Sequence, residues 1–314
     1  MGKHERQSIE EAEKIIKKIL NSELLVSGDK KNPWFDHAFQ IAKQISKDFP
    51  NISLAKHLGN RYDNMGDILI SSNGKNIFIE IKMSDTKSGV GTKANISQNA
   101  LTKNNLFAGK VKSWSFFRKE RGHEEWVGDY LDEFNRYSRE ILKTSNPVIQ
   151  KEKKARYLRD SKRDIESKTI LENIRERDRK EKLEYLNYLS TKKQDNEMIK
   201  RFFILITLGV HRKNALFDLM EEKNFLKEAQ NLFVYYANCH KGKVFIKKED
   251  VGNKVSKILS RYSNFKIIFP KGLTHCKIVG IRNNKPEPLL QIVLHWKNIA
   301  QGIKTPCLNI FDLT

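Results

Sequence analysis

The sequence predicts a mixed α/β fold, and three patterns along the chain support this prediction. Near the N-terminus, two stretches with the apolar spacing of helices precede two with the alternation of β-strands. The middle of the chain is rich in Lys, Arg and Glu, as in long solvated helices. The last part holds several short β-like runs separated by Gly, Asn and Pro.

Residues 8–20 and 34–49 are expected to be the helices that open the fold. In the first, apolar residues lie three or four positions apart, and the second follows Asn32-Pro33, a helix-start signal. Residues 67–70 and 76–83 are expected to form a hairpin, because Asn73-Gly74 between them is a strong tight-turn signal. A loop with glycines over 88–92 and a helix over 94–107 should follow.

The rest of the chain divides by composition. Residues 111–200 predict a charged helical insertion or subdomain, with Pro147 as its clear break. Residues 201–210, 214–230 and 232–238 predict a strand, a helix and a strand that return to the first sheet. Further strands are expected over 265–269, 276–281, 289–296 and 307–311. The predicted domains are thus residues 1–110 as the first part of a core, 111–200 as the insertion, and 201–314 as its completion plus a β-rich region.

The net charge indicates the class of partner. The 314 residues carry a formal net charge of +21, and 39% of them are apolar, which is enough for a core. Such an excess of positive charge attracts polyanions by counterion release. Nucleic acid is therefore considered first, ahead of an anionic membrane surface or an acidic protein. The sequence contains no run of about 18 apolar residues that could span a bilayer.

The N-terminus and the cysteines predict a cytoplasmic, reduced protein. Residues 1–19 are rich in Glu, Lys and Arg and lack an apolar signal core followed by a small-residue cleavage site. The three cysteines, Cys239, Cys276 and Cys307, are far apart and have no Cys or His nearby in zinc-ligand spacing. We expect them to be small core residues.

The residues that point to chemistry lie in the predicted hairpin. A strand has a period of two, so Glu80 and Lys82 should share one face while the isoleucines around them share the other. The turn should bring Asp67 alongside, where two carboxylates could share a divalent cation. Mg2+ binds a few carboxylate oxygens and keeps water and phosphate as its other ligands, which suits a site that holds a scissile phosphate. Lys82 could orient the attacking water, help remove its proton or stabilise the developing charge.

Gly66-Asp67, a short spacer and Ile79-Glu80-Ile81-Lys82 resemble the active-site motif of the PD-(D/E)xK nuclease superfamily, with Gly66 where that family usually has proline. Type II restriction endonucleases are the closest likeness. The resemblance covers residues 36–107 and implies a restriction-endonuclease-like core, a mixed sheet flanked by helices, with Asp67, Glu80 and Lys82 as catalytic residues and Mg2+ as cofactor. It also implies a sequence-specific enzyme of restriction-modification type that cuts double-stranded DNA as a homodimer, with the C-terminal region serving recognition or dimerisation.

Further residues near the motif have weaker assignments. Asp36, on the helix before the hairpin, could bind a second metal ion, although solvation at the surface is the simpler alternative. DNA contacts are predicted for four polar residues that follow the catalytic strand, each of which could instead be merely solvated: Lys87, Lys93, Gln98 and Lys103.

Three other functions compete with this one. One is a structural or ribosome-associated basic protein, which would prefer RNA and would not respond to chelation of Mg2+. Glu80 and Lys82 could be a solvated pair on the surface of a non-catalytic, basic DNA- or RNA-binding protein. A structure-specific repair nuclease of the same superfamily would share the metal site and differ in its substrate. Metal-dependent strand scission separates the nucleases from the binding protein, and the sequence does not separate the two nucleases from each other.

Overall fold

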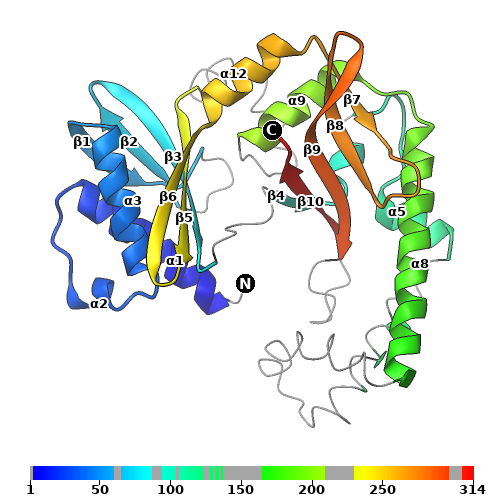
Figure 1. The fold of residues 1–314 in the computed structure, drawn as a ribbon, viewed down its shortest axis with the longest axis horizontal. Helices are drawn as coiled ribbons and strands as arrows, with labels where there is room; N and C mark the ends of the chain where they lie inside the picture. Colours follow the sequence, from blue (N-terminus) through cyan, green and yellow to red (C-terminus); the bar gives the residue numbers. More distant parts are fainter. Residues whose placement is uncertain are drawn as a thin grey trace. The chain divides into compact units, whose positions relative to one another are not determined.

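The computed structural model describes residues 3–59, 65–86, 94–103, 106–122, 128–129, 132–133, 136, 165–208, 230–296 and 306–314. These residues form helices and two five-stranded β-sheets, which confirms the α/β class (Figure 1). The chain divides into two compact units, each built from two separate segments. Unit 1 comprises Met1–Ala94 and Arg201–Ser263, and unit 2 comprises Asn95–Lys200 and Asn264–Thr314.

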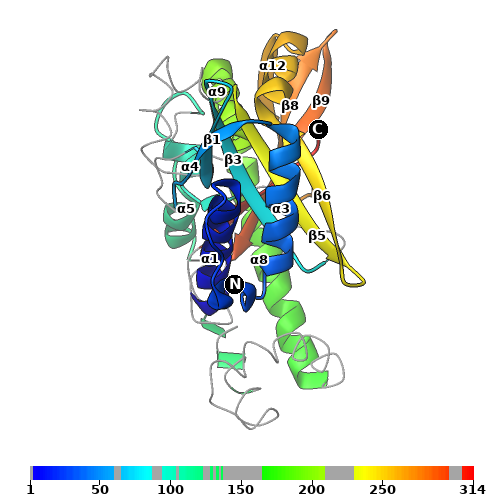
Figure 2. The same cartoon turned by 90° about the vertical axis from the view of Figure 1, so that its left-hand side faces the viewer.

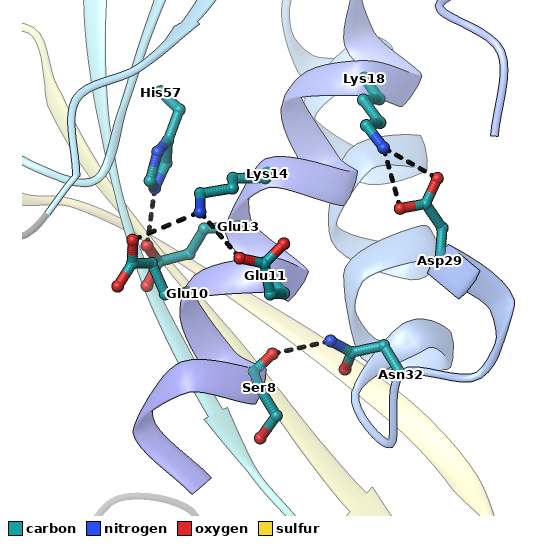
Figure 3. A network of polar contacts seen from close by, with 9 residues as sticks. All are labelled: Ser8, Glu10, Glu11, Glu13, Lys14, Lys18, Asp29, Asn32 and His57. Atoms are coloured by element: carbon teal, nitrogen blue, oxygen red, sulfur yellow. Dashed lines mark hydrogen bonds and ion pairs between the residues drawn. The ribbon is translucent and has the colours of Figure 1, made fainter. Parts of the chain in front are cut away.

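Unit 1 begins with the helices α1 (Lys3–Leu20), α2 (Ser27–Lys30) and α3 (Phe35–Asp48). The two helices predicted near the N-terminus are therefore confirmed. Polar contacts hold the loop between α1 and α3. Lys18 Nζ lies 2.9 Å from Asp29 Oδ1, and Asn32 Nδ2 donates to the carbonyl oxygen of Ser8 at 2.9 Å (Figure 3).

The sheet of unit 1 is mixed, with the strand order β1-β2-β3-β5-β6. Its strands are β1 (Ile52–His57), β2 (Ile68–Ser72), β3 (Lys75–Ser84), β5 (Leu232–His240) and β6 (Lys243–Asp250). Neighbouring strands are antiparallel except β3 and β5, which are parallel. The predicted hairpin is confirmed as β2 and β3, and the predicted strand over 232–238 is confirmed as β5. At the hairpin turn, Asn73 and Gly74 have φ values of +50° and +74°, as a tight two-residue turn requires.

The core of unit 1 lies between this sheet and the helices. Alternate residues of β3, namely Ile77, Ile79, Ile81 and Met83, are buried together with the apolar faces of α1 and α3. Figure 2 shows the two helices side by side in front of the strands. Burying an isoleucine side chain contributes roughly 2 kcal/mol, so this face fixes the register of β3. The residues between the isoleucines must then point to the opposite face.

The structure corrects one element in this part of the chain. Residues 201–210 were predicted to form a buried strand, but they begin within the helix α9 (Asn196–Thr207). Phe202, Phe203, Leu205 and Ile206 are all buried, so α9 is surrounded by protein along these turns. A short run of consecutive apolar residues has no period, and it fits a buried helix as well as a buried strand. The helix predicted over 214–230 lies outside the described residues.

Unit 2 contains the second sheet, with the strand order β4-β10-β9-β8-β7. Its strands are β4 (Ala94–Ser97), β7 (Asn264–Ile268), β8 (His275–Arg282), β9 (Lys285–Trp296) and β10 (Pro306–Asp312). The four strands predicted after residue 264 are confirmed. The helix predicted over 94–107 is wrong, because this stretch holds β4 and the short helix α4 (Ala100–Lys103). β4 adds to the sheet beside β10, a distant partner that local sequence does not reveal.

The charged middle of the chain contributes the helices α5 (Trp114–Glu120) and α8 (Ile165–Ser190) to unit 2. Pro147 and the predicted loop over 88–92 lie outside the described residues. The helix α8 is not only a solvated surface. Glu181 is fully buried, accepts a hydrogen bond from Trp114 Nε1 at 2.7 Å and lies 2.6 Å from Arg118 Nε. A buried carboxylate requires such partners, because leaving its charge unpaired would cost several kcal/mol.

The compact units group the chain differently from the predicted domains. The chain passes from one unit to the other after Ala94, Lys200 and Ser263, and the domain boundaries expected near residues 110 and 200 stay predictions. The C-terminal strands join the charged middle segment in unit 2, and only residues 201–263 return to the sheet that carries Glu80.

Candidate active site

Asp67, Glu80 and Lys82 come together on unit 1. Glu80 and Lys82 lie on the face of β3 opposite the buried isoleucines, as their spacing predicted. Asp67 immediately precedes β2 and is anchored to β3 twice. Its backbone N–H donates to the carbonyl oxygen of Ile79 at 2.8 Å, and its Oδ2 accepts from the backbone N–H of Ile81 at 2.7 Å. These bonds hold the Asp67 carboxylate beside the segment of β3 that contains Glu80.

Lys82 and Glu80 form an ion pair in which the Lys82 ammonium donates to Glu80 Oε1. The two side chains are 31% and 18% exposed, so the pair lies at the surface of the fold with limited access to water. A lysine held in this way keeps its charge directly next to the carboxylates. Any anion that approaches Glu80 and Asp67 therefore meets a positive group at the same place.

Burial and neighbouring charges raise the pKa values of two of the three groups, Asp67 and Lys82. Burial, together with the negative charges of Glu80 and Glu13, raises the pKa of Asp67 well above its usual range, although Lys82 and the Ile81 N–H act in the other direction. Burial acts to lower the pKa of Lys82, but Glu80 and Asp67 outweigh it and raise the pKa above its ordinary value. Burial and two neighbouring carboxylates therefore disfavour the ionised form of Asp67, and a single ammonium group, that of Lys82, favours it.

Glu13 is a functional candidate that sequence reasoning missed. It lies on α1, is only 5% exposed, and its Oε2 is 3.0 Å from His57 Nε2 on β1 (Figure 3). The signal was present in the helical spacing, since Glu13 is four residues after Ile9 and three before Ile16. A carboxylate on the apolar face of a helix is costly unless it is paired, so this position pointed to a partner.

The donor set fits Mg2+ better than it fits a metal held by protein ligands alone. Among the described residues, no group of three or more His, Cys, Asp or Glu side chains is placed to hold a metal ion. Mg2+ does not require three protein ligands, because it is commonly bound by one or two carboxylates and retains waters and substrate phosphates as its other ligands. Asp67 and Glu80 supply two carboxylates, and a divalent cation would offset the burial and the neighbouring negative charges that raise the pKa of Asp67.

The backbone at Gly66, the position where the PD-(D/E)xK motif that this segment resembles usually has proline, does not suit a proline. Its φ is +77°, in the left-handed region that proline cannot adopt. A Cβ at this position would also lie 2.7 Å from the carbonyl oxygen of Ile79. The chain enters β2 with its backbone tight against β3, and this close approach is what allows the Asp67 N–H to reach Ile79.

The structure describes three of the other predicted site residues, namely Asp36 in unit 1 and Gln98 and Lys103 in unit 2. Asp36 is exposed in the first turn of α3, and its role as a second metal ligand stays a prediction, whereas Glu13 is the additional carboxylate that acts on Asp67. Lys87 and Lys93 lie outside the described residues. Lys103 is the last residue of α4 in unit 2.

Gln98 has a structural partner. It follows β4 in a turn, where an exposed helical position was expected, and it is 6% exposed. Its Nε2 donates to Ser115 Oγ at 2.9 Å, and its Oε1 accepts from the Ser115 N–H at 3.2 Å. Both ends of the amide thus fix the start of α5, and a DNA contact by Gln98 stays a prediction.

The substitution Asp67→Asn is expected to stabilise the protein by about 1 kcal/mol at neutral pH and to abolish any metal-dependent activity. The amide retains an oxygen for the Ile81 N–H but removes the repulsion from Glu80 and Glu13. The folded protein binds the Asp67 proton more tightly than the unfolded chain does, so this contribution to stability is lost as the pH rises through the raised pKa.

Thermal unfolding of both proteins over a pH series starting near the ordinary Asp pKa of 3.8 tests this expectation. The difference in Tm between Asp67→Asn and the wild type should grow with pH, because only the wild type must ionise this group. A difference that stays constant over the series would contradict the assignment of Asp67 as a carboxyl that resists ionisation.

The comparisons with known proteins add no assignment. No family model, curated protein or solved structure matches the chain. Within the described ranges, no helix combines the length and the apolar character needed to cross a membrane. Cys239, Cys276 and Cys307 are all free thiols, and the last two are buried, as expected of small core residues.

Proposed function

We propose that the chain is a Mg2+-dependent, sequence-specific endonuclease that hydrolyses phosphodiester bonds in double-stranded DNA, with Asp67, Glu80 and Lys82 as its catalytic residues. The observation that carries the proposal is the junction of these groups. Asp67, which precedes β2, and Glu80 and Lys82 on β3 bring two carboxylates and an ammonium together on the mixed sheet of unit 1. That composition supports binding of a divalent cation beside a phosphate.

Each residue has a distinct task in this proposal. Asp67 and Glu80 would hold Mg2+, which when bound supplies Lewis-acid polarisation of the phosphate and lowers the pKa of a water molecule. The Ile81 N–H fixes the orientation of the Asp67 carboxylate. Lys82, whose pKa is raised, is protonated at neutral pH and therefore stabilises negative charge on the phosphate; it does not remove a proton.

The substrate follows from charge and from the resemblance stated above. A net charge of +21 supports association with a nucleic acid duplex by counterion release. The similarity to type II restriction endonucleases supports double-stranded DNA with a specific site, and a two-fold symmetric site calls for a homodimer. The recognition strands of such an enzyme belong to the second unit in this proposal, because the first provides the catalytic sheet.

A digest of plasmid and phage DNA tests the proposal directly. The purified protein is incubated with Mg2+ or with EDTA, and the products are separated by size. Discrete fragments that require Mg2+ are the expected result. A ladder of unrelated fragments would support the structure-specific nuclease of the same superfamily, and intact DNA with every divalent metal tested would overturn the proposal.

A non-catalytic DNA-binding protein is the second candidate. The observation that favours it is the lack, within the described residues, of three ligands placed to hold a metal, together with the ion pair that Lys82 already makes with Glu80. Such a protein would bind DNA equally well with Mg2+ or EDTA and would never cut it.

A further inference from the structure

The edge strand β6 has two different faces. Val244 and Ile246 pack against the core of unit 1, and Lys248 lies on the same side, with its Nζ 4.5 Å from the Phe49 ring centroid. The residues that alternate with these, namely Lys243, Phe245 and Lys247, must point to the opposite face because a strand has a period of two. All three are exposed, and Phe245 is 56% exposed.

The strand register connects this face to the candidate active site. Lys82 is paired with Tyr236 across the parallel strands β3 and β5, and Tyr236 is paired with Lys247 across β5 and β6. Directly paired residues point to the same side of a sheet. Lys82, Tyr236 and Lys247 therefore form one row across three strands, and Phe245 and Lys243 extend it along β6. Because β5 and β6 also form an antiparallel hairpin, we call this surface, made of Tyr236 on β5 and Lys243, Phe245 and Lys247 on β6, the hairpin face.

The charge of the hairpin face is positive. Glu249, an acidic residue on β6, is paired with other groups: Tyr236 donates to Glu249 Oε2 at 3.0 Å, and Lys254 Nζ lies 3.1 Å from Glu249 Oε1. Lys247 Nζ lies 5.9 Å from the centre of the Tyr236 ring. The surface that leads away from Lys82 thus presents two lysines and an exposed aromatic ring, with Glu249 neutralised by Lys254.

We propose that the hairpin face binds the DNA strand on one side of the scissile phosphate, with Lys243 and Lys247 on backbone phosphates and Phe245 packed against a sugar or base. This inference rests on the proposed function, because it takes the position of the cut from Asp67, Glu80 and Lys82. Lysines suit phosphates as mobile point charges, and an exposed aromatic ring offers a stacking surface that does not depend on base identity. The hairpin face therefore supplies affinity rather than sequence recognition.

The neighbouring lysines of β6 provide a matched test. Lys247→Ala and Lys248→Ala remove the same charge from adjacent positions of one strand, but only Lys247 belongs to the hairpin face. Binding of a fluorescent mixed-sequence duplex is measured by anisotropy in EDTA over a series of salt concentrations. Lys247→Ala and Lys243→Ala should each lower the slope of log K against log salt by about 1. Lys248→Ala should leave this slope unchanged.

Phe245→Ala adds a second, independent readout. It should weaken binding about fivefold or more while leaving the salt slope unchanged, because it removes an uncharged contact. Circular dichroism of all variants verifies that the exposed substitutions leave the fold intact. Equal slopes for Lys243→Ala, Lys247→Ala and Lys248→Ala would overturn the inference.

The same proteins separate this inference from the proposed function. If the wild-type protein cuts DNA with Mg2+ but the lysine variants have unchanged slopes, the nuclease proposal is retained. DNA binding by the hairpin face is then rejected. Altered slopes for Lys243→Ala and Lys247→Ala with no scission under any divalent metal would remove the nuclease proposal and retain the hairpin face as a DNA-binding surface.

Discussion

Glu80→Ala is expected to lower the rate of Mg2+-dependent DNA cleavage by roughly 10³-fold or more, while duplex binding in EDTA stays close to that of the wild type. The substitution removes one of the two carboxylates proposed to hold Mg2+ and releases Lys82 from its ion pair. Since the Glu80 side chain is partly exposed on the face opposite the core, its loss should leave folding intact. Single-turnover cleavage at saturating protein, alongside anisotropy, measures the two quantities separately.

Glu11→Gln is the matched control for charge. Glu11 lies on the exposed side of α1, where it contacts Lys14 at 2.8 Å, and its side chain is 60% exposed. Neutralising it should change neither cleavage nor binding. If Glu80→Ala cut DNA at the wild-type rate, Glu80 would be a solvated residue of the sheet and the catalytic assignment would be wrong.

Gly66→Ala is expected to destabilise the protein by about 3 kcal/mol or more, and Gly66→Pro, which introduces the proline usual in the motif that this segment resembles, should destabilise it further. The φ of +77° at Gly66 strains any residue with a side chain, and its Cβ would contact the carbonyl oxygen of Ile79. Because the next residue is Asp67, relief of this contact would move the carboxylate away from the Ile81 N–H. Cleavage should therefore be lost together with stability.

Gly74→Ala separates the cost of a positive φ from the cost of the steric contact with Ile79. Gly74 has nearly the same φ, +74°, but a Cβ there would have no atom within 4 Å. This variant should cost only about 1 kcal/mol, the conformational part of the penalty. Urea unfolding of the two alanine variants gives the difference, which measures the close approach of Gly66 to β3. Equal losses at the two glycines would show that Ile79 tolerates a side chain at position 66.

The parts of the fold that were predictable have strong local signals. The hairpin of β2 and β3 combined period-two alternation with Asn73-Gly74, and the same alternation placed Glu80 and Lys82 on one face. The amphipathic helices α1 and α3 were equally clear. These signals depend only on residues close in sequence, which is why the candidate site could be located before its geometry was known.

The features that the sequence did not predict either depend on contacts with distant residues or lack a periodic pattern of apolar residues. β4 joins β10, and the apolar run over residues 202–206 of α9 is buried without interruption, so neither had a local pattern that revealed its state. β6 is rich in lysine and resembles a solvated loop, yet Val244 and Ile246 pack on the core. Glu13 was missed because it is far from the motif in sequence, and only the packing of α1 brings its charge near Asp67.

The parallel pairing of β3 with β5 has a consequence for the order in which the protein becomes complete. β3 (Lys75–Ser84) finds its neighbour only at Leu232–His240, after the whole first segment of unit 2 has been synthesised. Until then one edge of the strand that carries Glu80 and Lys82 is unpaired, and unpaired edges tend to associate with other chains. Such non-local contacts slow folding. During translation, a nascent chain would therefore lack the complete five-stranded sheet of unit 1 until β5 and β6 have been synthesised.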